Sequence, residues 1–321
     1  MERALALVDR WVEEGAVPGI AVAVVSRAGP VAQHVAGVTL RGGDRPVDAD
    51  TLFALASLTK PLVAVAVCVA VEEGLVELDA EVAYGYALRH LLSHASGVSD
   101  DDDQPRFPPG TRRAYSNRAY RLAAEQIERA SGLPFADYLR SGVLEPLGGE
   151  IVYGLPARLS ERAATVYQPG TSGERELFNS EAFRSAPRAS SGAFATAPGY
   201  GRLLSCLLAG GATPAGHVLA GETVDELLAC QFGELPGVVA GVGEWPDLCW
   251  GLGFDVRGRR QPHWSGVGLS PTAASHFGAS GTLAWLDRER GLGLVALANR
   301  STYSGWWIER WPELTAAVLS V

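Results

Sequence analysis

The sequence is organised around residues 56–61, Ala-Ser-Leu-Thr-Lys-Pro, and around the apolar run at 62–71 that follows them. Lys60 is the only lysine in the chain, although lysine and arginine together number 27. A lysine amine can lose its proton near neutral pH when burial lowers its pKa, whereas a guanidinium cannot. A single lysine three residues after Ser57 therefore indicates a nucleophile and its base.

The apolar run predicts a buried helix. Pro61 suits the first turn of a helix, and Gly74 after two glutamates is typical of a helix end. In such a helix Ser57 and Lys60 lie one turn apart on the same face, with Ser57 at the positive end of the helix dipole. The run is rich in valine, so a buried strand stays open as the alternative.

Composition predicts a well-cored globular protein. The chain has 321 residues, 47% hydrophobic and 20% charged, with a mean hydropathy of +0.08. A net charge of −9 and a pI of about 5.2 argue against nucleic acid as a partner. No apolar stretch reaches the roughly 18–20 residues that span a bilayer. The first residues read as an amphipathic helix with internal acids, not as a secretory signal, so we expect a cytoplasmic protein without membrane contact.

The cysteines are expected to be reduced. They are far apart in the sequence and form no C-x-x-C pair: Cys68, Cys206, Cys230 and Cys249. Reduced, buried thiols are the usual state in the cytoplasm. His90 and His94 are four apart, but no third ligand is evident nearby, so no metal site is predicted. The four aspartates at 100–103 predict a solvated loop, with calcium binding as the alternative.

The predicted fold class is α+β. Strand patterns occur near both ends of the chain, while helical patterns fill the middle. An antiparallel sheet is expected to combine the N- and C-terminal strands, with the terminal helices flanking it and an all-helical lobe inserted. The expected division is a sheet domain of residues 1–55 and 245–321 and a helical domain of residues 56–244, with the active site in the cleft between them.

A serine and an amine need helpers to act on an acyl group. They require a second proton carrier, an amide to orient the acyl group and donors for an oxyanion. Tyr115 and Asn117, two apart at a turn, are candidates for the first two. The stretch at 276–282, in which glycines follow His276, is the candidate for the rest, because glycines let backbone N–H groups approach a bound carbonyl.

These motifs resemble the serine β-lactamase and penicillin-binding-protein-like superfamily, and specifically its class C β-lactamase and esterase branch. Residues 57–60 match its S-x-x-K motif, 115–117 its Y-x-N motif, and 276–278 the H-x-G variant of its K-T-G motif. Segments at 50–53, 91–97, 109–111, 145–148 and 250–254 are similar to the family as well. The resemblance covers nearly the whole chain, and three ordered motifs are more specific than any one of them.

The resemblance implies a mechanism through an acyl-enzyme. Ser57 would attack an ester or amide carbonyl, and Lys60 and Tyr115 would share the proton transfers, with the primary base left open. The backbone N–H groups of Ser57 and Ala279 would hold the oxyanion. Asn117 would orient the acyl side chain and Lys60, and His276, Gly278 and Ala279 would line the substrate site. No metal or cofactor is implied, and His94 resembles a structural position.

One departure from the family bears on substrate. Its lactamases and peptidases usually carry lysine in the third motif, where that lysine meets a substrate carboxylate. His276 is mostly neutral at pH 7, which weakens anion recognition unless Arg112 or Arg113 substitutes. We therefore expect an esterase-like hydrolase of a small-molecule acyl substrate, as a monomer or homodimer. A β-lactamase or a D-amino-acid-specific peptidase is the alternative.

Other classes of protein fit the sequence less well. Residues 190–192, Ser-Ser-Gly, are similar to the serine-rich stretch of Ser-Ser-Lys amidases, but the glycine-rich flank of those enzymes is missing. The chain has no G-x-S-x-G elbow and no G-x-G-x-x-G or G-x-x-x-x-G-K motif, which disfavours an α/β-hydrolase and a nucleotide cofactor. A non-catalytic binding module of the same fold is a further alternative.

Overall fold

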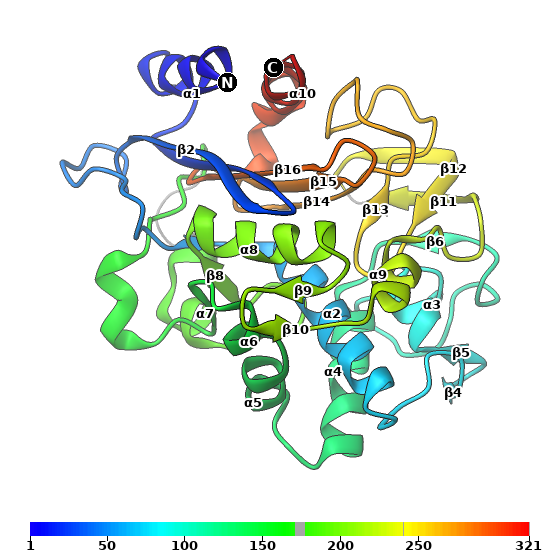
Figure 1. The fold of residues 1–321 in the computed structure, drawn as a ribbon. Coiled ribbons are helices and arrows are strands. Elements are labelled where there is room, and N and C mark those ends of the chain that lie inside the picture. The colour runs from blue at the N-terminus through cyan, green and yellow to red at the C-terminus, as the bar shows by residue number, and fades with distance from the viewer. Residues whose placement is uncertain (171–176, 240, 321) are drawn as a thin grey trace.

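The computed structural model describes residues 1–170, 177–239 and 241–320. Within these ranges one large sheet is covered by helices on both faces, as Figure 1 shows. Its strand order is β2-β1-β16-β15-β14-β13-β12-β11-β6. The strands are β1 (Gly19–Ser26), β2 (Gly29–Gly37), β6 (Arg113–Ala114), β11 (Leu235–Val239), β12 (Gly243–Trp250), β13 (Asp255–Val256), β14 (Ala274–Gly278), β15 (Thr282–Asp287) and β16 (Leu292–Ala298).

The sheet joins the two ends of the chain. β1 pairs antiparallel with β16, with Ile20 opposite Ala298, and the β1–β2 hairpin completes this edge. All neighbouring strands are antiparallel except β11 and β6, which are parallel. The expected α+β class with an antiparallel sheet of N- and C-terminal strands is therefore confirmed. β6, β11 and the start of β12 come from the segment expected to be all-helical, where they extend the sheet at its far edge.

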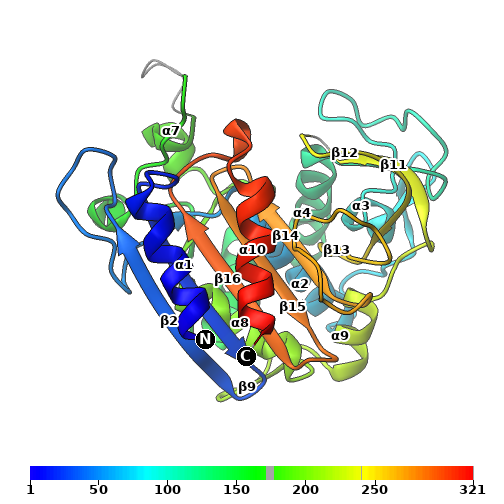
Figure 2. The ribbon, with the colours of Figure 1, turned by 90° about the horizontal axis from the view of Figure 1, so that it is seen from above.

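Helices form the layers on either side of the sheet. α1 and α10 lie next to each other on one face, which brings the two termini together (Figure 2). α8 packs beneath β1 and β16 on the other face, with α2 and the remaining helices below it (Figure 1). The helices are α1 (Glu2–Glu13), α2 (Thr59–Glu72), α3 (Leu88–Leu92), α4 (Asn117–Ser131), α5 (Phe135–Leu139), α6 (Glu145–Leu147), α7 (Glu181–Ser185), α8 (Ala197–Leu208), α9 (Gly221–Leu228) and α10 (Trp307–Leu319).

Shorter elements connect these strands and helices, most of them in the lobe below the sheet. The small strands are β3 (Phe53–Ala54), β4 (Glu81–Ala83), β5 (Tyr86–Ala87), β7 (Ile151–Tyr153), β8 (Ala193–Ala195), β9 (Ala212–Thr213) and β10 (Gly216–His217). The short helices are η1 (Ala56–Leu58), η2 (Arg140–Leu144), η3 (Ala157–Arg162), η5 (Leu177–Asn179) and η6 (Thr302–Ser304). The expected domain ranges 56–244 and 245–321 include residues 171–176, 240 and 321, which lie outside the described residues, and that division stays a prediction.

The apolar run forms a buried helix, as predicted. Every residue of α2 from Thr59 to Ala70 is buried, because the helix is apolar on all sides and packs against its neighbours around its circumference. The alternative of a buried strand is wrong. At the lower side of the sheet α2 shares one core with α8, and a second, tryptophan-rich core lies between the sheet, α1 and α10.

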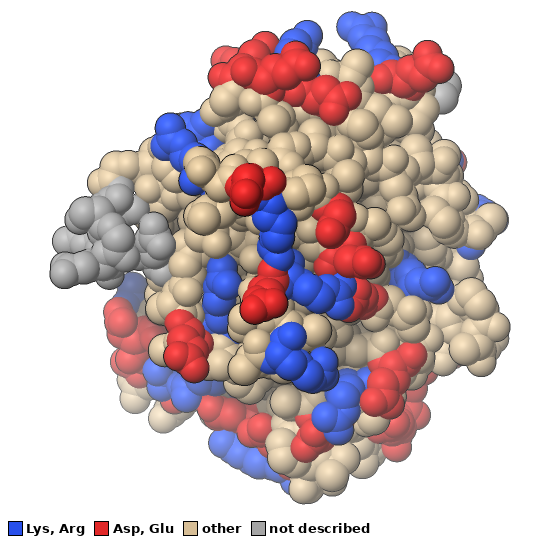
Figure 3. All heavy atoms as spheres, turned by 90° about the vertical axis from the view of Figure 1, so that its left-hand side faces the viewer, with Lys and Arg blue, Asp and Glu red and all other residues tan. Residues whose placement is uncertain are grey.

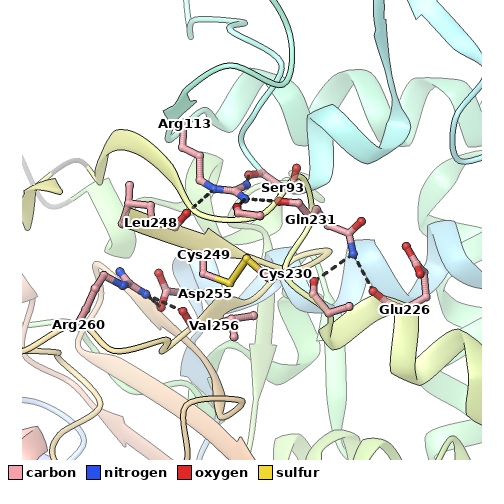
Figure 4. The surroundings of a disulfide bond; sticks show 12 residues. Ser93, Arg113, Glu226, Cys230, Gln231, Leu248, Cys249, Asp255, Val256 and Arg260 are labelled. Atoms are coloured by element: carbon pink, nitrogen blue, oxygen red, sulfur yellow. Dashed lines mark hydrogen bonds and ion pairs between the residues drawn. A yellow bond between two sulfur atoms is a disulfide. The ribbon is translucent and has the colours of Figure 1, made fainter. Parts of the chain in front are cut away.

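The expectation of four reduced cysteines is wrong for two of them. Cys230 and Cys249 form a disulfide between the segment after α9 and the end of β12 (Figure 4). Their Cα atoms are 5.3 Å apart although 19 positions separate them in sequence, a proximity that spacing alone does not reveal. Cys68 and Cys206 are free and buried. The reduced state was expected from a cytoplasmic location, and that location stays a prediction.

Charges on the surface are mixed. On the face shown in Figure 3, acidic and basic side chains are interspersed rather than separated into patches of one sign. Among the described residues, no helix combines the length and the apolar character needed to cross a membrane.

Candidate functional site

Ser57 lies in η1, in the turn between β3 and α2. The preceding residue, Ala56, has a φ of 45°, in the left-handed region that residues with a side chain seldom adopt. The turn is fixed by its surroundings: the Leu55 amide donates to Ala193 O at 2.9 Å, and the buried Tyr200 hydroxyl donates to Leu58 O at 2.9 Å. Backbone strain that the surrounding fold holds in place is a frequent feature of functional sites.

Lys60 is fully buried and reaches three oxygen atoms. Its Nζ lies 3.1 Å from Ser57 Oγ, 2.8 Å from Asn117 Oδ1 and 3.1 Å from Ser190 O. Burial lowers the pKa of Lys60 from 10.5 to about 7, and the nearby negative charge of Asp100 opposes this shift only in part. A large fraction of the amine is therefore neutral at pH 7 and able to accept a proton.

Tyr115 lies on the other side of Ser57. It follows β6 and precedes α4, where the Ser116 side chain caps the helix by accepting from the Ala119 amide. Its hydroxyl lies near the side chain of Ser57, and Lys60 Nζ is 4.7 Å from its ring centroid. Burial raises the pKa of Tyr115 well above its usual value, so the phenol stays protonated at neutral pH.

His94 packs against the turn that carries Tyr115. It is buried, its ring contacts those of Tyr115 and Trp250, and its Nδ1 accepts from the Ser116 amide at 3.2 Å. Burial lowers the pKa of His94, so the ring is neutral. His94 thus positions the turn that carries Tyr115 and Asn117, which agrees with the structural role that the resemblance implied.

The end of β14 brings the third motif next to the serine. Gly278 approaches so closely that a Cβ atom in its place would collide with the Leu55 carbonyl oxygen. The Thr282 hydroxyl donates to Leu55 O at 3.0 Å, and the Ser280 hydroxyl donates to Ala54 O at 2.5 Å. The Gly278–Ala279 backbone therefore lies beside the turn of Ser57, and its role as an oxyanion donor stays a prediction.

His276 belongs to β14 as well, and its side chain is buried. Only 1% of the residue is exposed, its Nδ1 donates to Phe277 O at 2.8 Å, and its ring packs near Tyr115 and Trp250. Burial and the nearby charge of Lys60 lower the pKa of His276 to about 3. His276 is therefore neutral at neutral pH, while its contact with a substrate stays a prediction.

Of the two arginines named as replacements for a third-motif lysine, Arg113 is not free to act in that way. Arg113 is buried and donates to the carbonyl oxygens of Leu248, Ser93 and Gly233, and also to that of Gln231. Figure 4 shows this guanidinium enclosed by three of those backbone groups. Arg112 is about half exposed and lies 3.8 Å from Glu244.

Two groups of the site carried no assignment from sequence. Ser190 O contacts Lys60 because β8 pairs with β3, directly before η1, and this brings the turn at 188–192 over the amine. Asp100, the first residue of the run of four aspartates, contacts Asn117. A backbone carbonyl has no sequence signal, whereas the aspartate run is visible in the sequence but is typical of a solvated loop.

A cavity opens beside these groups. It has a volume of about 520 Å³ and reaches from Asn117 and Ser190 to Phe135 and Tyr153. Positively charged arginine and negatively charged glutamate side chains also line it. Two of its lining residues, Asn117 and Ser190, contact Lys60, but Ser57 and Lys60 do not line the cavity themselves.

Fold and site together define the class of penicillin-binding-protein-like and β-lactamase-like proteins. The chain belongs to the Beta-lactamase family, whose model matches residues 5–317. The esterase EstB of Burkholderia gladioli is 29% identical, over 94% of this chain and 90% of the relative. A β-lactamase structure from Mycobacterium bovis is 35% identical with a TM-score of 0.76, covering 97% of this chain and 98% of that one. A family VIII carboxylesterase, at 20% identity and a TM-score of 0.80, covers 98% and 97% and shows the same fold.

The pKa of Lys60 predicts the pH dependence of activity. A base must be neutral to accept the serine proton, so with Lys60 in that role kcat/KM is expected to fall tenfold per pH unit below about pH 7 and to level off above it. The measurement is hydrolysis of p-nitrophenyl acetate from pH 5.5 to 9, with Ser57→Ala as the blank for spontaneous hydrolysis. A profile that is flat down to pH 5.5 would contradict a base with this pKa.

Proposed function

We propose that the protein is a serine hydrolase that acts through an acyl-enzyme on ester or small amide substrates, with a preference for esters. The observation that carries the proposal is the buried amine of Lys60, 3.1 Å from Ser57 Oγ, with its pKa lowered to about 7. An alcohol becomes a nucleophile when an adjacent base takes its proton, and a buried neutral amine is such a base. The names of the relatives, an esterase and a β-lactamase, agree with this chemistry.

The proposed acylation step assigns one role to each group. Ser57 Oγ attacks the carbonyl carbon while its proton passes to Lys60 Nζ, and the carbonyl oxygen becomes an oxyanion beside the backbone N–H groups of Ser57 and Ala279. When the bond to the leaving alcohol breaks, that oxygen takes a proton from the protonated Tyr115–Lys60 pair. The lowered pKa of Lys60 and the raised pKa of Tyr115 support the amine as base and the phenol as proton donor.

The proposed deacylation step uses the same groups in reverse. A water molecule attacks the acyl carbon and gives its proton to the pair of Lys60 and Tyr115. The bond to Ser57 Oγ then breaks, the serine regains a proton, and the carboxylic acid leaves. The step balances, because every proton that is removed is returned within one turnover.

The preference for esters rests on the third motif. With a pKa of about 3, His276 carries no charge that could hold a substrate carboxylate at neutral pH. β-Lactams and D-alanyl peptides carry such a carboxylate, while simple esters do not. Replacement of the usual lysine by histidine therefore weakens the binding of a neutral ester less than the binding of an anionic substrate.

A substrate panel tests this proposal. The value of kcat/KM is expected to be higher for p-nitrophenyl acyl esters of increasing chain length than for a chromogenic cephalosporin or a D-alanyl-D-alanine peptide. Ser57→Ala supplies the matched background for every substrate. A higher kcat/KM on the cephalosporin or the peptide would overturn the ranking in favour of the lactamase or peptidase, and absence of turnover throughout would favour a binding module.

A further inference from the structure

Asp100 is the member of the aspartate run that contacts Asn117. Its Oδ1 accepts from the backbone amides of Asn117 at 2.7 Å and Arg118 at 3.2 Å, and its Oδ2 accepts from Asn117 Nδ2 at 3.0 Å. Burial by itself would raise the pKa of Asp100, but these hydrogen bonds lower it below its usual value, so the side chain is a carboxylate. As a carboxylate it can only accept hydrogen bonds.

The number of N–H donors on Lys60 determines the direction of its lone pair. A neutral amine has two N–H donors and one lone pair. Of its three neighbours, Ser190 O and Asn117 Oδ1 are carbonyl oxygens that can only accept, at 3.1 and 2.8 Å. Both N–H groups are therefore engaged there, and the lone pair is left facing Ser57 Oγ at 3.1 Å, the one neighbour of the three with a proton to give.

This arrangement depends on which end of the Asn117 amide faces the amine. If the amide turned over, its NH₂ group would face Lys60 and compete with Ser57 for the lone pair. Asp100 prevents the turn, because its Oδ2 has no proton and pairs only with the NH₂ end. We propose that Asp100 is a positioning residue that holds the Asn117 oxygen on Lys60 and so keeps the lone pair of the amine on Ser57. The inference rests on the proposed hydrolase function and names a residue that this function does not use directly.

Capping of α4 is a separate task. The two backbone amides bind Oδ1 of Asp100, whereas the side-chain amide of Asn117 binds Oδ2. The Ser116 side chain also caps the helix, independently, through the Ala119 amide. A substitution that keeps one acceptor oxygen but replaces the other with a donor therefore separates positioning from capping.

The charge of Asp100 has a second, distinct effect. It raises the pKa of Lys60 against the larger effect of burial, so loss of the charge moves this pKa down. The other titratable groups near Lys60 are neutral at pH 7 according to the directions of their pKa shifts. They are Tyr115 and Tyr120, whose rings are 4.7 and 5.5 Å from Nζ, and His94 and His276.

Asp100→Asn tests the inference with Asp101→Asn as the matched control. The amide introduced by Asp100→Asn retains an oxygen for the backbone amides, but its NH₂ group meets the NH₂ group of Asn117 and drives that amide to turn over. For p-nitrophenyl acetate, kcat is expected to fall about tenfold or more with KM little changed, since one charge-assisted hydrogen bond is lost. The acid limb of the pH profile is expected to move to lower pH. Asp101, whose side chain is 91% exposed, is expected to be replaceable without effect.

A double-mutant cycle with Asn117→Ala tests whether Asp100 acts through the side-chain amide of Asn117. Once the amide is absent, Asp100→Asn is expected to cause little further loss of kcat, whereas two independent roles would give additive losses. Additive losses, or equal kcat and equal pH profiles for Asp100→Asn and Asp101→Asn, would overturn the inference while leaving the hydrolase function intact. Absence of ester turnover by the unsubstituted protein would instead overturn the proposed function, and the inference with it.

Discussion

Replacement of Ser57 by alanine is expected to lower kcat/KM for p-nitrophenyl esters by about 10⁴-fold or more, because the proposed nucleophile of the acyl-enzyme is removed. The fold should be unaffected, since the serine Oγ makes its contacts to Lys60 and Tyr115 within the site. Urea unfolding of both proteins provides that check. A fluorophosphonate probe should add its mass to the peptide that contains Ser57 in the unsubstituted protein and should not label the variant.

Ser191→Ala is the matched control for this experiment. Ser191 belongs to the Ser-Ser-Gly stretch that prompted the amidase interpretation, and its neighbour Ser190 contacts Lys60 only through its carbonyl oxygen. Full activity and labelling at Ser57 are expected in this variant. Labelling at Ser191, with turnover lost on its replacement, would transfer the nucleophile to the amidase arrangement.

Replacement of Lys60 by arginine is expected to lower kcat/KM by about 10²–10⁴-fold, the usual contribution of a general base. The guanidinium keeps its proton in the pocket, so it can still donate to Asn117 Oδ1 and Ser190 O but offers no lone pair to Ser57. Hydrolysis of p-nitrophenyl acetate at pH 8, where Lys60 is mostly neutral, gives the most sensitive comparison.

A second variant distinguishes loss of the base from loss of folding. Arginine is longer than lysine and brings a permanent charge into a fully buried site, so Lys60→Met serves as an uncharged side chain of similar length. Both variants are expected to be inactive, and the methionine variant is expected to unfold cooperatively in urea. Activity within a few-fold of the unsubstituted protein in either variant would show that the amine is not the base.

The sequence foretold the parts of the fold whose signal is local. The apolar run of α2 and the serine–lysine spacing each follow from a pattern within a few residues. The meeting of β1 with β16 followed from the placement of strand patterns at both ends of the chain.

The features that could not be predicted from the sequence depend on contacts between distant segments. β6 and β11 consist of two and five residues, and their parallel pairing joins segments more than a hundred positions apart. The same kind of contact creates the Cys230–Cys249 bond and brings Ser190 O over Lys60. Asp100 was hidden in another way, because four adjacent aspartates look alike until the fold turns one of them toward Asn117.

The arginine-rich composition has a practical consequence for the study of this site. Because Lys60 is the only lysine, protein grown with isotope-labelled lysine carries the label at one side chain, and that side chain contacts Ser57, Asn117 and Ser190. A single magnetic resonance signal would then report the protonation of the pocket without assignment of any other residue. The chain in effect contains its own spectroscopic probe, already placed beside the reacting oxygen.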